Sequence, residues 1–171
     1  MQSPGRYLIG IDLGTTNSAV AYIDSQEAAR GAVPKIHIFQ IPQLVAEAEI
    51  GTSETLPSFI YFASEDEAAT LRLKLPWQHG LAPVTGILAR EQGSLVPGRQ
   101  VSSAKSWLCH DAVNRTARIL PWGADQPDFA CSPVEASTRY LTHIRDAWNY
   151  TFALEGSGPD ESRFEQQQIV L

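Results

Sequence analysis

The chain has few cysteines and no long apolar run. Its two cysteines, Cys109 and Cys131, lie outside any Cys-x-x-Cys pair, and no histidine spacing resembles a zinc site. We expect Cys109, which stands beside His110 next to an apolar segment, to have a buried or half-buried structural role. No apolar run approaches the length of a transmembrane helix, and residues 1–6 lack the features of a signal peptide. The sequence therefore predicts a cytoplasmic protein with no membrane partner.

Basic residues are also scarce. Lys and Arg number 13 against 19 Asp and Glu, so the formal net charge is −6 at pH 7. Because a nucleic-acid-binding domain normally carries a basic patch, we expect no nucleic-acid partner. The remaining composition is typical of a globular protein, with 43% hydrophobic and 19% charged residues, and 171 residues suffice for one domain with a core.

Two common nucleotide-binding motifs are missing. The chain contains no Gly-x-x-x-x-Gly-Lys followed by Ser or Thr, which excludes a P-loop. It also lacks the Gly-x-Gly-x-x-Gly of dinucleotide-binding helices, since three residues separate Gly10 from Gly14 and residues 18–23 alternate like a strand. A phosphate site in this region would therefore lie on a hairpin turn and not at a helix N-terminus.

The most informative stretch that is present spans residues 8–22. Apolar and β-branched residues flank a short turn made of Gly14, Thr15 and Thr16, which predicts two adjacent strands of a hairpin. Such a turn places backbone N–H groups and two hydroxyls in one concavity that suits phosphate oxygens. Asp12 ends the first strand, where a carboxylate could hold a hydrated divalent cation. The alternative is an ordinary hairpin whose threonines satisfy its own turn, but that would not need Asp12.

The sequence Gly-Ile-Asp-Leu-Gly-Thr-Thr-Asn-Ser resembles the first phosphate motif of the actin-like ATPases, which include actins, sugar kinases and heat-shock chaperones. Within this superfamily it is most similar to the motif of the DnaK-type chaperones. The resemblance implies an α/β fold of the actin-like, ribonuclease H-like kind, with a mixed β-sheet and flanking helices. It also implies ATP and Mg²⁺ as cofactors. The implied metal residue is Asp12, and the implied phosphate-binding residues are Gly14, Thr15, Thr16 and Asn17.

Later segments extend the resemblance. The Pro57–Ser58 pair resembles a Thr-Pro-Ser stretch of the same chaperones, and residues 103–108 resemble the context of a lysine that reaches the γ-phosphate. The resemblance thus gives Lys105 and Thr15 catalytic roles in phosphoryl transfer. Ser106 and Trp107 depart from the family's usual residues. The alternative for Lys105 is a solvated surface lysine.

Further patterns predict secondary structure. We expect a strand over residues 35–39, a β-rich run over 54–62, and helices over 86–93, ending at glycine, and over 102–108. Residues 24–30 are turn-like, and we expect residues 70–85 to form a long loop or an inserted element. Ser132, Pro133 and Glu135 predict a capped helix that runs to about Leu154. Residues 168–171 begin a buried strand.

The resemblance covers most of the chain, but only as the front lobe of a nucleotide-binding domain. We expect residues 1–50 and 132–171 to form the core sheet and helix, and residues 51–131 an inserted smaller subdomain. The family's second phosphate motif, Asp-Leu-Gly-Gly-Gly-Thr, its adenosine motif and its peptide-binding domain have no counterpart here. The fragment alone is therefore predicted to lack ATPase activity and to bind nucleotide weakly.

In the intact protein, the resemblance implies that ATP is bound and hydrolysed to ADP to drive binding and release of unfolded polypeptides, with co-chaperones as partners. The face left by the missing lobe predicts self-association. Alternatives are a fragment of an actin-like filament protein or sugar kinase, and a non-catalytic interaction module that keeps the fold.

Overall fold

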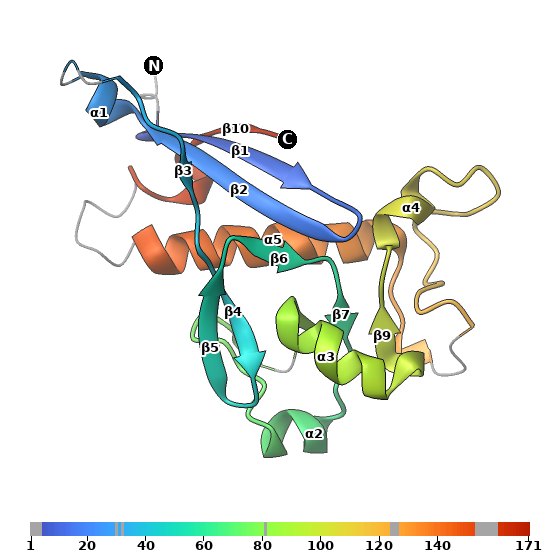
Figure 1. The fold of residues 1–171 in the computed structure, drawn as a ribbon. Coiled ribbons are helices and arrows are strands. Elements are labelled where there is room, and N and C mark those ends of the chain that lie inside the picture. Colours follow the sequence, from blue (N-terminus) through green and yellow to red (C-terminus); the bar gives the residue numbers. More distant parts are fainter. Residues whose placement is uncertain (1–4, 30, 32, 81, 124–126, 153–160) are drawn as a thin grey trace.

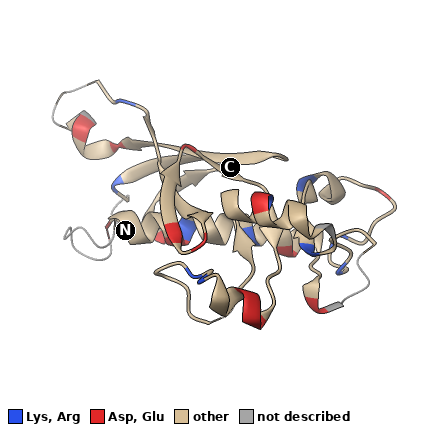
Figure 2. Cartoon of the chain, turned by 60° about the horizontal axis from the view of Figure 1, so that its bottom comes forward, with Lys and Arg blue, Asp and Glu red and all other residues tan. Residues whose placement is uncertain are grey.

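The fold is mixed α/β, and the part of the chain that the structure describes contains three β-sheets with helices packed around them (Figure 1). The computed structural model describes residues 5–29, 31, 33–80, 82–123, 127–152 and 161–171. None of the helices in this part of the chain combines the length and apolar character that a membrane crossing requires. Acidic and basic residues are interspersed along the described chain (Figure 2).

The largest sheet has five strands and contains the predicted hairpin. Its order is β10-β1-β2-β3, and β6 pairs with β2 beyond the end of β3. β1 and β2 are antiparallel, in register from the Tyr7–Asp24 pair to the Leu13–Ser18 pair, while β10 runs parallel to β1. The strands are β1 (Tyr7–Leu13), β2 (Asn17–Asp24), β3 (His37–Ile38), β6 (Thr55–Pro57) and β10 (Gln168–Val170). The predicted strand–turn–strand over residues 8–22 is confirmed.

The helix α5 (Pro133–Phe152) lies across one face of this sheet (Figure 1). Alternate residues of β1, Tyr7, Ile9 and Ile11, are buried in one core with the α5 residues Ile144 and Trp148. The start of the helix is as predicted, and the predicted end near Leu154 lies outside the described residues. The residues between them, beginning with Leu8, face away from α5, as the 39% exposure of Leu8 indicates.

The closing strand is present, but its predicted burial is wrong. All three residues of β10 are exposed, and Val170 is 60% accessible. β10 lies at the edge of the sheet, and Val170 pairs with Gly10, which belongs to the alternation facing away from α5. An apolar strand at a sheet edge is thus exposed by its position. Self-association through this edge or face stays a prediction.

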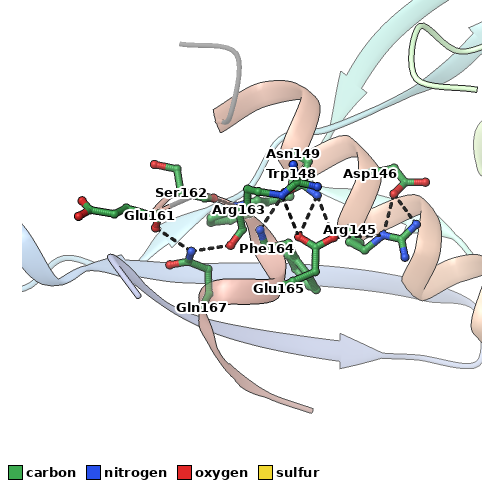
Figure 3. A network of polar contacts seen from close by, with 10 residues as sticks. All are labelled: Arg145, Asp146, Trp148, Asn149, Glu161, Ser162, Arg163, Phe164, Glu165 and Gln167. Carbon is green, nitrogen blue, oxygen red and sulfur yellow. Dashed lines mark hydrogen bonds and ion pairs between the residues drawn. The ribbon is translucent and has the colours of Figure 1, made fainter. Parts of the chain in front are cut away.

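Polar contacts fix the segment before β10 onto α5 (Figure 3). The Trp148 indole Nε1 donates to the Ser162 carbonyl oxygen at 2.9 Å, and Asn149 Nδ2 donates to the Glu165 carboxylate at 3.1 Å. Gln167 Oε1 accepts a hydrogen bond from the Tyr7 backbone N–H at 2.7 Å. These bonds place the 3₁₀ turn η3 (Phe164–Gln166) under the sheet edge and align β10 with β1.

A reciprocal cap begins α5. Ser132 Oγ accepts from the Glu135 backbone N–H at 3.1 Å, and the Glu135 carboxylate accepts from the Ser132 N–H at 2.7 Å. Removing such a cap leaves a helix N–H without a partner. A similar capping box begins α2 (Glu65–Thr70), with Ser64 as its cap, but α2 has no buried residue.

We expect Ser132→Ala to lower the free energy of unfolding by about 1 kcal/mol, because α5 carries the main core and its first turn cannot fray without disturbing that core. Urea denaturation followed by circular dichroism measures the loss. Ser64→Ala removes the equivalent bond from α2 and is the control, with a smaller expected loss. Equal losses of unfolding free energy in the two variants would contradict the special importance of the Ser132 cap for the core.

A second cluster of elements surrounds two smaller sheets. One is the hairpin β4–β5, and the other has the order β8-β7-β9. A separate apolar core that includes Leu44, Tyr61 and Leu88 joins them to α3. The elements are β4 (Ile41–Ala46), β5 (Glu49–Ser53), β7 (Ile60–Tyr61), β8 (Val84–Thr85), β9 (Gln100–Val101), α3 (Ile87–Leu95) and the 3₁₀ turn η1 (Pro97–Arg99). Two further elements, α4 (Ala104–Leu108) and the 3₁₀ turn η2 (Pro127–Phe129), contact the main core through Ala104 and Phe129. The predicted division of the chain into core and inserted subdomain stays a prediction.

Several local predictions need correction. Residues 24–30 contain a short helix, α1 (Ser25–Ala29), and the strand expected over residues 35–39 is limited to His37–Ile38. Gly93 does not end α3, which continues to Leu95. The glycine allows close packing, because a Cβ atom at this position would collide with the Gln100 side chain. Cys109 is exposed, since it is the residue that follows the last turn of α4.

Candidate phosphate-binding turn

The turn between β1 and β2 is tight and open to solvent. Thr15, Thr16 and Asn17 are exposed. A Cβ atom on Gly14 would collide with the carbonyl oxygen of Asn17, so only glycine allows the chain to fold back this closely. The tight turn leaves the two threonine hydroxyls on the surface, where a phosphate group can reach them.

Ser58 holds the turn from its inner side. Its Oγ donates to the Gly14 carbonyl oxygen at 2.9 Å, and its backbone N–H donates to the Thr16 carbonyl oxygen at 2.8 Å. The Tyr140 hydroxyl donates to the Ser58 carbonyl oxygen at 2.9 Å, and burial raises the pKa of this phenol, which keeps its proton. Two turn carbonyls are thereby occupied, and the turn is connected to α5 through one buried serine.

Sequence reasoning did not assign Ser58 to the site. The Pro57–Ser58 pair entered only as part of the family resemblance. The same pair was the signal that could have identified Ser58 as a site residue. Pro57 ends β6, which pairs with β2 from Asn17 to Ala19. The pairing delivers Ser58 directly beneath the turn, and this depends on contacts across about forty residues that the sequence does not show.

The structure brings Lys105 to the same turn. Its ammonium Nζ donates to the Leu13 carbonyl oxygen, at the end of β1. Lys105 lies on α4, where Ser103 has a left-handed backbone (φ 53°) and Ala104 is buried in the main core. The side chain is half-buried and makes a specific contact with a segment 92 residues away. This contact distinguishes Lys105 from a solvated surface lysine.

Asp12 is exposed and lies just before the turn. It shares the sheet face of Leu8, away from α5, because β1 alternates along its length. Among the described residues, no three His, Cys, Asp or Glu side chains gather to form a complete metal cage. Mg²⁺ is commonly held by one or two carboxylates together with phosphate oxygens and waters, so a single aspartate beside a phosphate turn fits its chemistry.

The candidate site therefore combines an exposed turn with hydroxyl groups, one neighbouring ammonium and one neighbouring carboxylate. The glycine that keeps the turn open and the lysine beside it fit a phosphate, and the aspartate fits a hydrated cation. No family model matches the chain, and a search of curated proteins finds no match.

Proposed function

We propose that this chain forms one wall of an ATP site of the actin-like kind, as in DnaK-type chaperones. The observation that carries the proposal is the contact of Lys105 with the end of β1, which puts a cation beside the Gly14–Asn17 turn. Actin-like filament proteins and sugar kinases share the turn motif. The lysine segment and the Ser-Pro-capped helix favour the chaperone type.

In the proposed site, the turn binds and orients the phosphates of ATP or ADP through backbone N–H groups and the hydroxyls of Thr15 and Thr16, with Asn17 as a further donor. Asp12 holds the hydrated Mg²⁺, which on binding would neutralise part of the phosphate charge. Lys105 leaves the Leu13 carbonyl oxygen and binds the γ-phosphate, because an anionic oxygen is a stronger acceptor than a peptide carbonyl. Its charge then offsets the charge that develops during phosphoryl transfer.

The described residues supply one side of such a site, so the chain alone should hold nucleotide weakly and should not hydrolyse it. In the proposed intact chaperone, the opposite lobe would complete the cleft, and hydrolysis would drive binding and release of unfolded polypeptides with co-chaperones. Weak binding is still measurable on this chain, because nuclear magnetic resonance reports which backbone amides a ligand approaches.

We expect titration with Mg-ATP to shift the amide resonances of residues 14–17 before any others, with no micromolar dissociation constant in calorimetry. Lys105→Ala should raise the dissociation constant for Mg-ATP about fivefold, because one charge-assisted contact is lost at a partly exposed site. Lys74→Ala removes an exposed lysine outside the turn and is the matched control. Shifts centred elsewhere, or equal effects of the two variants, would refute the proposal.

A further inference from the structure

A cavity of about 560 Å³ lies between α5 and the segment of residues 77–80 and 82–85. Trp77 and Pro83 line it from the segment, and Thr138, Thr142 and His143 line it from the helix. None of its lining residues belongs to the phosphate turn. Its size is in the range of small-molecule sites, which run from roughly 300 to 1,000 Å³.

Arg139, which lines this cavity, carries a hydrogen-bond donor without a partner. Its Nε is buried without a hydrogen-bond partner, and the side chain forms no ion pair within 4.0 Å with any residue in the described part of the chain. The acidic residues of the cavity are engaged elsewhere: Glu135 accepts from the Ser132 N–H, and Asp146 accepts from Arg145 at 2.7 Å. A buried donor without an acceptor is costly, so an anionic ligand would gain a contact that the protein leaves open.

His143 supplies a hydrogen-bond acceptor. The residue is only 6% exposed, and its Nε2 lies 2.9 Å from the Pro42 carbonyl oxygen. Because a carbonyl only accepts, Nε2 carries the hydrogen. Burial lowers the pKa of His143 to about 4, so the ring is neutral at pH 7 and Nδ1 is an unprotonated acceptor. The rings of Trp77 and His143 meet edge to face, with their centroids 5.8 Å apart, so an aromatic side chain lies next to the acceptor.

We propose that this cavity binds a small organic anion with a flat ring and one N–H or O–H donor. The carboxylate pairs with Arg139, the ring lies against Trp77, and the donor bonds to His143 Nδ1. The combination is specific because each of the three groups meets a different part of one small molecule. The proposal is independent of the ATP site, since the two share no residue and either can fail alone.

Indole-3-acetate carries all three features and is the probe. We expect calorimetry or amide-shift titration of the chain at pH 7 to show at least tenfold tighter binding of indole-3-acetate than of indole-3-acetamide, which keeps the ring and the donor but lacks the charge. Benzofuran-3-acetate keeps the carboxylate and the ring shape but has no N–H. It should bind about fivefold more weakly than indole-3-acetate.

The Arg139→Gln variant should bind both indole ligands with equal affinity, close to that of the amide in the unaltered chain. Arg90→Gln, an exposed arginine on α3 outside the cavity, is the matched control and should keep the tenfold preference. Equal binding of acid and amide by the unaltered chain, or no binding up to the solubility limit, would overturn the proposal. The comparison of acid and amide on the unaltered chain needs no variant, so it remains decisive if Arg139→Gln does not fold.

Discussion

Replacing Trp148 by alanine is expected to lower the free energy of unfolding by about 4 kcal/mol. The side chain is fully buried where α5 crosses the large sheet, and its removal leaves a cavity that the surrounding strands cannot fill. Aromatic rings from both ends of the chain contact it at centroid distances of 4.3–6.1 Å: Tyr7, Tyr22, Phe39, Phe152 and Phe164.

The hydrogen bond of the indole adds to this loss. Trp148 Nε1 donates to the Ser162 carbonyl oxygen, so alanine also leaves that buried acceptor unpaired, and β10 loses part of its support on α5 (Figure 3). Trp148→Phe keeps most of the ring but loses the bond, and should cost about half as much.

Chemical denaturation monitored by far-ultraviolet circular dichroism measures both variants of Trp148. Trp122→Ala is the matched control, because Trp122 is 69% exposed and outside the main core, and it should cost less than about 1 kcal/mol. A loss for Trp148→Ala no larger than that of the control would show that the aromatic cluster does not hold the sheet and helix together.

Local signals predicted the elements that are determined locally. The hairpin of residues 8–22 and the start of α5 have their signals within a few residues: an alternating pattern around Gly14, and Ser132 followed by Pro133 and Glu135. In both cases the side chains that stabilise the turn or the helix end are neighbours in sequence, and the structure follows the pattern.

Other features depend on distant contacts or on unusual turns. The β4–β5 hairpin was not predicted, because its turn has no Gly or Asn and uses Ala48 with a left-handed φ of 56°. The exposure of β10 follows from its place at the sheet edge, which its apolar sequence does not show. The cavity lined by Arg139 and His143 lies between α5 and residues far from it in the sequence, among them Trp77 and Pro83.

The candidate phosphate site lies between these cases. Its turn could be predicted from residues 8–22 alone, whereas Ser58 and Lys105 reach it across 44 and 92 residues of sequence. Lys105 was assigned through a family resemblance and not through any local pattern; the structure shows its contact with Leu13, and its role toward phosphate stays a prediction. Both residues bind main-chain oxygens of Leu13 or Gly14, so the turn is supported from two separate elements.

Acidification is expected to destabilise the chain through His143. Burial lowers the pKa of this residue from 6.5 to about 4, against smaller opposing effects of the Pro42 carbonyl and Asp146. In the unfolded chain His143 therefore binds a proton below pH 6.5, whereas in the folded chain it binds this proton only below about pH 4. Stability is fully present above pH 6.5 and falls as the pH decreases through this window, by about 3 kcal/mol in total.

A comparison of the unaltered chain with His143→Gln isolates this effect from the other changes that acid causes in the chain. Glutamine can still donate to the Pro42 carbonyl oxygen but does not titrate. We expect urea denaturation between pH 7 and pH 4 to show a loss for the unaltered chain that exceeds the loss for the variant by about 3 kcal/mol. Parallel pH profiles would mean that burial does not lower the pKa of His143 and that the folded chain binds this proton as readily as the unfolded chain.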